Sequence, residues 1–200
     1  MESNWVKNRT ADGGAQDKVI QFKMPHEIVL KSWTNKHGSA MWGSTAPDKL
    51  DKLVKSNKGL YEVLTTYPQK VYFDIDKDDH DDYEHNYDYL TKVKSIISEH
   101  FHEPDMAVSG SCGLNSKGIM KTSYHIVLNN YILKTHEDKQ ILKQFVRYIS
   151  QEHDAGFDYA VYSRNQNLKM INQSKRDDPR IQSILDDMEP KKHIVSGILV

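Results

Sequence analysis

Two aspartates with one residue between them form the most chemically suggestive feature of the chain. Asp74 and Asp76 follow the apolar run Val71-Tyr72-Phe73, and Ile75 separates them. Because side chains alternate along a strand, both carboxylates would lie on one face while Ile75 points into the core. Adjacent carboxylates repel each other unless a cation lies between them, and Mg²⁺ or Mn²⁺ prefers such oxygen ligands. The pair predicts a metal site; the alternative is a solvated acidic turn, because residues 78–82 hold four more aspartates.

A second polar segment carries Lys121, Ser123 and His125 at alternating positions. On a strand these residues share a face and present an ammonium, a hydroxyl and an imidazole together. Such a row suits phosphate oxygens. The alternative is an ordinary strand whose polar face meets solvent.

A third acid, Asp158, precedes a segment rich in amides and lysines. Asn165, Asn167, Lys169 and Lys175 follow it with little acid between them. Asp158 would complete a site of three carboxylates, and the lysines would hold a triphosphate. The alternative is a polar hairpin with a basic exposed edge.

The elements that must position these residues alternate between strand and helix, which predicts an α/β or α+β fold. Apolar residues at helical spacing predict helices at 48–55, about 87–101 and 141–152. Runs of β-branched and aromatic residues predict strands at 70–76, 106–109, 124–128, 158–162, 168–171 and 193–200. We expect residues 1–17 to form a flexible arm and residues 18–200 to form one catalytic core, a module of a longer protein.

Composition limits the class of protein. The chain has 200 residues, 38% hydrophobic and 28% charged, which is typical of a globular protein. No apolar run approaches the roughly 20 residues that span a bilayer, and the N-terminus lacks the features of a signal peptide. The single cysteine, Cys112, excludes an internal disulfide, so we expect an intracellular protein that does not bind membranes. The formal net charge of −1 hides a segregation into acids at 74–88 and a basic cluster, including Arg176 and Arg180, after position 163.

The order of the three segments resembles the archaeo-eukaryotic primase superfamily, and within it the primase-polymerase branch that includes primases of large DNA viruses. Its members carry an acid-x-acid strand end, a Ser-x-His strand, and a third acid that leads into a basic nucleotide-binding segment. Tyr61-Glu62-Val63 before the first motif, Lys121 before Ser-x-His, and the run from Val161 to Lys169 extend the likeness. The resemblance covers about residues 59–177.

This resemblance implies a catalytic core with an RRM-like mixed sheet flanked by helices, and a smaller N-terminal α/β unit. It implies DNA primase or polymerase activity, with Asp74, Asp76 and Asp158 binding two Mg²⁺ or Mn²⁺ ions. It implies nucleotide-binding roles for Lys121, Ser123, His125, Asn167, Lys169, Lys175 and, against the sugar, Tyr61. The implied partners are a single-stranded DNA template and primer, nucleoside triphosphates, and a fused or separate replicative helicase.

Departures from the family pattern bear on these expectations. Gln166 and Lys169 stand where relatives often carry arginine, and lysine lacks the bidentate fork of arginine. Without a zinc-binding module, extension of a primer is expected more than its initiation.

Two other functions remain as alternatives. A haloacid-dehalogenase-like phosphatase also places Asp-x-Asp after an apolar strand, although Asp78 stands where that chemistry usually has Thr or Val. An inactive primase relative would act as a nucleic-acid-binding module of a replisome. Trp33 and Trp42 near Lys36 and His37 could stack on a template base, but a core role is the preferred interpretation. His80 and His85 are expected in a solvated loop, and Cys112 in a passive one.

Overall fold

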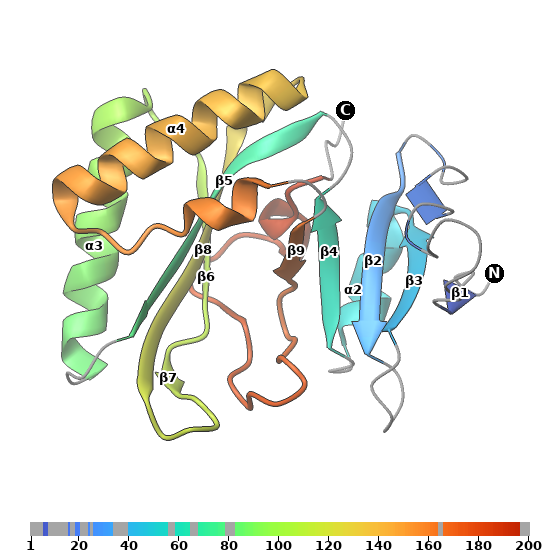
Figure 1. Ribbon diagram of the computed structural model, residues 1–200. Helices are drawn as coiled ribbons and strands as arrows, with labels where there is room; N and C mark the ends of the chain where they lie inside the picture. The colour runs from blue at the N-terminus through green and yellow to red at the C-terminus, as the bar shows by residue number, and fades with distance from the viewer. Residues whose placement is uncertain are drawn as a thin grey trace.

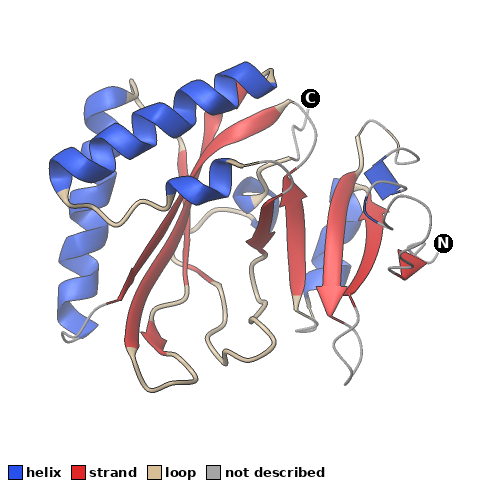
Figure 2. Ribbon diagram, viewed as in Figure 1, coloured by secondary structure: helices blue, strands red, loops and turns tan. Residues whose placement is uncertain are grey.

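The computed structural model describes residues 6–7, 16, 19–20, 24, 26–33, 40–55, 59–64, 68–78, 83–163 and 166–196, with the side chains of residues 6, 7, 33 and 83–86 excepted. This part of the chain contains two antiparallel sheets with helices beside them (Figures 1 and 2).

The first sheet is built mainly from the N-terminal third of the chain. Its strand order is β1-β3-β2-β4-β9. The strands are β1 (Val6–Lys7), β2 (Ile28–Trp33), β3 (Ala40–Thr45), β4 (Leu60–Leu64) and β9 (Gln166–Lys169). A 3₁₀ turn, η1 (Pro47–Lys49), leads into the short helix α2 (Leu50–Val54), whose buried Leu50 and Val54 pack with β2 and β4. The helix expected at 48–55 is therefore confirmed.

The second sheet carries the candidate catalytic strands. Its order is β10-β6-β8-β5, and β7 also pairs with β8. The strands are β5 (Gln69–Asp78), β6 (Met106–Gly110), β7 (Gly113–Leu114), β8 (Met120–Leu133) and β10 (Ser183–Ile184). Strands β5, β6 and β8 confirm those expected at 70–76, 106–109 and 124–128 and extend beyond them.

Two long helices, α3 (Tyr83–His100) and α4 (His136–His153), lie together beside this second sheet (Figure 1). Val93, Ile97, Val146 and Ile149 join the buried cluster that β5, β6 and β8 form. A capping box in which Thr135 and Asp138 bond each other's backbone begins α4. Apolar side chains thus fill the helix side of the sheet.

The C-terminal segment connects the two sheets. Residues from β9 to the 3₁₀ turn η3 (Pro190–His193) lie between them in Figure 1. Buried Glu62 of β4 accepts hydrogen bonds from the backbone N–H groups of Val195 (3.0 Å) and Ser196 (2.6 Å), and Lys70 N–H of β5 donates to Val195 O (2.8 Å). The chain end therefore holds the neighbouring strands β4 and β5 in place.

Several expectations from the sequence are wrong. Residues 158–162 form no strand: Asp158 caps a 3₁₀ helix, η2 (Tyr159–Tyr162), by accepting a hydrogen bond from Ala160 N. The strand expected at 168–171 corresponds to β9, and it pairs with β4. In place of the strand expected at 193–200, His193 ends the 3₁₀ turn η3 and residues 194–196 follow it without regular structure; residues 197–200 lie outside the described residues. The strand pairs described are all antiparallel, not mixed.

The coarse class, α+β, is confirmed. Within the described ranges, no helix is both long and apolar enough to cross a membrane. The expected arm at 1–17 falls largely outside the described residues.

Candidate active site

The register between β5 and β8 brings the first two predicted motifs together. Asp74 lies directly opposite His125, and Asp76 lies opposite Ser123. Side chains of directly opposed residues project from the same face of an antiparallel pair. The acid pair and the Ser-x-His row, which are separate in the sequence, therefore share one face. The Asp74 Oδ1 and His125 Nε2 atoms are 3.5 Å apart.

The third predicted acid reaches the same row from the other side of β5. The segment before η2 runs antiparallel to β5, with a bridge between Ile75 and Phe157. Asp158 N–H donates to Asp74 O at 2.8 Å, and Asp76 N–H donates to Gly156 O at 3.1 Å. Asp158 thus adjoins Asp74 on one side as His125 does on the other.

The electrostatics of Asp74 reflect this crowding. Its side chain is 17% exposed. Burial, and next the carboxylates of Asp158 and Asp76, raise the pKa of Asp74 to about 7. Lys175 and Lys169 oppose this rise. A carboxylate in this position is stabilised in its charged form by any additional cation.

His125 is neutral at physiological pH. Burial, and then the charges of Lys169 and Lys175, lower the pKa of His125 to about 3. A neutral imidazole presents one N–H donor and one acceptor nitrogen. The contact with Asp74 is therefore a long polar contact rather than an ion pair.

Lys121 occupies the outer end of the acid row. Its ammonium lies 3.3 Å from Asp76 Oδ1 and 2.9 Å from Asp78 Oδ1. Burial alone would lower the pKa of Lys121, but its bonds to Asp78 and Asp76 outweigh this effect and raise it. Lys121 is therefore a cation held at the acid pair, in the position where the sequence predicts a phosphate-binding residue.

Lys169 enters the site from the first sheet. Its Nζ donates to Ser111 Oγ at 2.8 Å and to Arg180 O at 3.4 Å, and the residue is 6% exposed. Burial, and next the charges of Lys175 and Arg180, lower the pKa of Lys169 to about 8. Ser111 in turn lies next to Ser123 of β8, because Ser111 N–H donates to Ser123 O at 2.9 Å. Lys169 thus connects β9 to the polar face of the second sheet.

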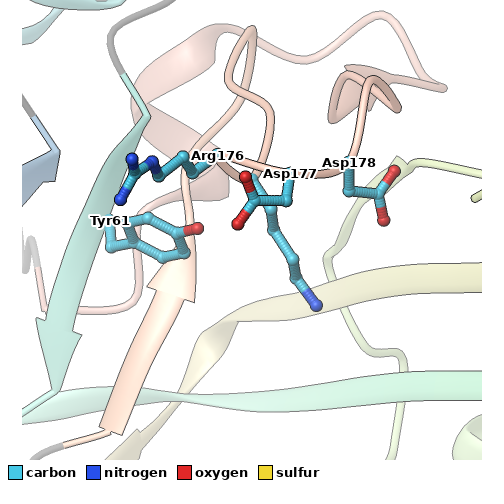
Figure 3. A pocket seen from close by; sticks show the side chains of 5 residues that line it. Tyr61, Arg176, Asp177 and Asp178 are labelled. Atoms are coloured by element: carbon cyan, nitrogen blue, oxygen red, sulfur yellow. The ribbon is translucent and has the colours of Figure 1, made fainter. Parts of the chain in front are cut away.

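A pocket of about 360 Å³ adjoins this polar face, lined by Tyr61, Lys175, Arg176, Asp177 and Asp178 (Figure 3). Tyr61 lies opposite Lys169 in the β4–β9 pair, so both side chains project from one face. In Figure 3 the Arg176 side chain lies beside the Tyr61 ring. Two residues assigned from sequence, Tyr61 and Lys175, therefore meet in one pocket.

The remaining predicted residues are less closely grouped. Asn167 is exposed on the same side of β9 as Lys169 and is not among the five pocket residues. Trp42 is buried at 7% exposure in a cluster with Val29 and Val63, which confirms the core interpretation.

Other residues singled out from the sequence are placed only in part. Cys112 is a free thiol whose Sγ lies 3.8 Å from Ser123 O. The backbone of His85 lies in α3, while Lys36, His37, His80 and Asn165, together with the side chains of Trp33 and His85, lie outside the described residues.

No three His, Cys, Asp or Glu side chains in the described ranges are arranged to hold a metal ion together. Two of the three predicted carboxylates make other contacts in this structure. Asp158 Oδ1 accepts from Ala160 N at 2.8 Å, and Asp76 contacts Lys121. The donor set itself suits Mg²⁺ or Mn²⁺, because it consists of carboxylate oxygens.

Sequence reasoning missed a group of supporting residues. Arg180 donates to Ser111 O at 3.1 Å and forms an ion pair of 2.5 Å with Asp178. Gln182 Nε2 donates to Ser109 Oγ at 3.0 Å. The sequence indicates Arg180 only as one of several basic residues, and alternation of Ser109 and Ser111 is the signal that would have extended β6 toward the site.

No family model matches this chain, and no curated protein matches it in sequence.

Proposed function

We propose that this chain is the catalytic core of a DNA primase or primase-polymerase. It transfers a nucleotide from a nucleoside triphosphate to a primer 3′-hydroxyl as directed by a single-stranded DNA template. The observation that supports this most is the β5–β8 register, which sets Asp74 opposite His125 and Asp76 opposite Ser123. Three motifs that resemble those of primases in the sequence thus adjoin one another in space.

Asp74, Asp76 and Asp158 would hold two divalent ions. For all three to do so, Lys121 must release Asp76, and the Asp158 side chain must turn from Ala160 N. Bound Mg²⁺ or Mn²⁺ would supply positive charge that favours ionisation of the attacking hydroxyl and stabilises the transferred phosphate. Burial, and next the carboxylates of Asp158 and Asp76, raise the pKa of Asp74, and these neighbouring negative charges would favour cation binding here.

The phosphate groups would lie along the neighbouring row. Ser123 offers a hydroxyl, and neutral His125 offers an N–H donor without the cost of a buried charge. Lys169, which donates to Ser111 Oγ, and Lys175 add positive charge close enough to lower the pKa of His125 further, beyond the effect of burial. The charge balance of this region suits an anionic ligand that arrives together with cations.

The sugar and base of the nucleotide would extend into the pocket beyond Lys175. Tyr61 lines this pocket and would supply an aromatic wall against the sugar. The pocket volume of about 360 Å³ lies at the lower end of the range for small-molecule sites, which suits a nucleoside.

A primer-extension assay tests the proposal, with a DNA template, a labelled primer, Mg²⁺ or Mn²⁺ and nucleoside triphosphates. Asp74→Asn and Asp76→Asn should each abolish extension while the protein stays folded by circular dichroism. Asp88→Asn, an exposed acid on α3, is the matched control and should keep full activity. Full activity of the site variants would refute the proposal. Template-independent release of phosphate would favour the phosphatase, and template binding without extension would favour the inactive module.

A further inference from the structure

The pocket beside Tyr61 differs in charge from the phosphate-binding row. Lys175 and Arg176 line it together with two carboxylates, those of Asp177 and Asp178. A pocket for phosphate alone would gain nothing from acids, because carboxylates repel phosphate oxygens. The acids indicate a ligand portion that donates hydrogen bonds.

The loop that carries these acids is held in place. Asp178 binds the Arg180 guanidinium through both of its oxygens, and Arg180 Nη1 donates to Ser111 O at 3.1 Å. Asp178 N–H also donates to Lys175 O at 3.3 Å, closing the turn that contains Arg176 and Asp177. The Asp178 carboxylate is thus occupied by Arg180, whereas Asp177 is exposed at the pocket.

The side chains around Asp177 indicate which part of a nucleotide it would meet. In Figure 3 the Asp177 carboxylate lies on the side of the pocket to which the Tyr61 hydroxyl points, and Arg176 lies at the opposite side of the ring. Asp178 lines the pocket and binds Arg180, whose Nη1 donates to Ser111 O at 3.1 Å. Ser111 N–H in turn donates to Ser123 O at 2.9 Å, so this end of the pocket borders the phosphate row. The part of the nucleotide next to the phosphates is the sugar.

We propose that Asp177 is a specificity-determining residue that accepts a hydrogen bond from the ribose 2′-hydroxyl, so that the protein prefers ribonucleotides to deoxyribonucleotides. This inference rests on the proposed function. An ionised carboxylate is an acceptor only, and the 2′-hydroxyl is a donor that deoxyribose lacks. A carboxylate on a nucleotide base is a poorer match, because template-directed synthesis must accept every base at the same position, whereas the sugar is common to all of them.

A site that hydrogen-bonds a hydroxyl of its substrate discriminates against the analogue without that hydroxyl. The test compares kcat and KM for ATP and dATP in templated primer extension by the unaltered protein, Asp177→Ala and Asp187→Ala. Asp187 is an exposed acid on the C-terminal segment and is the matched control. In Asp177→Ala we expect kcat/KM for ATP to fall about tenfold or more, mainly through KM, while the value for dATP stays unchanged. An equal fall for both nucleotides, or an unchanged ratio, would overturn the inference.

A binding measurement separates this inference from the proposed function. Calorimetric titration of the same three proteins with ATP and with dATP, in Mg²⁺, requires no turnover. Tighter binding of ATP than of dATP, lost in Asp177→Ala and kept in Asp187→Ala, supports the sugar contact even if no primer is extended. Equal affinity of the unaltered protein for ATP and dATP, or binding of neither, overturns it. Absence of extension counts against the polymerase function alone.

Discussion

Asp74 and His125 face each other across the β5–β8 pair, with 3.5 Å between Asp74 Oδ1 and His125 Nε2, yet the two do not form an ion pair at neutral pH. Burial lowers the pKa of His125 to about 3, so the imidazole carries no charge. Negative charge at this point comes from the carboxylates of Asp74, Asp76 and Asp158, and Lys121 offsets part of it through its contact with Asp76. This charge is the basis of the proposal that the three carboxylates bind divalent cations.

The raised pKa of Asp74 predicts a pH-dependent effect of its replacement. The folded pKa is about 7, and the unfolded value is about 4, so the folded protein binds more protons between these values. The contribution of Asp74 to stability is therefore fully present below about pH 4 and is lost as pH rises through 7. The free energy of unfolding of Asp74→Asn, relative to that of the unaltered protein, should therefore be higher at pH 8 than at pH 4 by on the order of a few kcal/mol.

Urea unfolding in metal-free buffer at both pH values measures this difference. Asp88→Asn should show no such dependence, because Asp88 is exposed on α3. A change in stability in Asp74→Asn that is the same at pH 4 and pH 8 would show that the pKa of Asp74 is not raised in the folded protein.

The pairing of Tyr72 and Tyr162 predicts a second effect, on the segment that carries Asp158. Tyr162 OH donates to Tyr72 O at 2.5 Å, and Tyr72 OH donates to Val161 O at 2.8 Å. Both rings are fully buried, with centroids 5.1 Å apart. Tyr162→Phe leaves a buried carbonyl without this donor and should cost about 1–3 kcal/mol of unfolding free energy.

Chemical denaturation measures this cost, and Tyr159→Phe is the control because Tyr159 is 43% exposed in the same 3₁₀ helix. Tyr159→Phe should stay within about 0.5 kcal/mol of the unaltered protein. Equal effects of the two substitutions would mean that the Tyr162 hydroxyl does not anchor η2.

The buried hydrogen bonds of Lys169 predict an effect of its replacement on nucleotide binding. Its ammonium donates hydrogen bonds to Ser111 Oγ and Arg180 O. Lys169→Met removes both hydrogen bonds and one positive charge, so the KM for nucleoside triphosphate should rise about tenfold or more. Steady-state extension kinetics measure this rise, and Lys134→Met, at an exposed position before α4, is the control. A KM equal to that of the control would show that Lys169 is structural only.

The sequence was sufficient to place the individual motifs but not their pairing. Alternation correctly placed Asp74 and Asp76 on one face of their strand, and Ser123 and His125 on one face of another strand. The register that opposes them depends on the long-range fit of two buried strands, of which Ile75 and Tyr124 are one pair, and no local pattern encodes that fit.

The errors also have physical causes. Asp158-Tyr-Ala-Val-Tyr162 alternates as a strand does, but the Asp158 side chain accepts from Ala160 N and begins a helical turn instead. Helix α3 begins at Tyr83, before the expected start near residue 87. The expected start is too late because the first turn of the helix is polar and its apolar periodicity begins only near Leu90. The role of Arg180 could not be foreseen, since it depends on contact with Ser111, far away in the sequence.

The central claim is that Asp74, Asp76 and Asp158 together bind the catalytic metal ions, and anomalous diffraction from crystals grown with Mn²⁺ and a non-hydrolysable nucleoside triphosphate tests it most directly. We predict anomalous peaks about 2.0–2.4 Å from oxygens of all three carboxylates, with Lys121 turned away from Asp76 and the triphosphate along Ser123 and His125. A bound triphosphate with no anomalous peak at these aspartates, and Lys121 still in contact with Asp76, would contradict the claim.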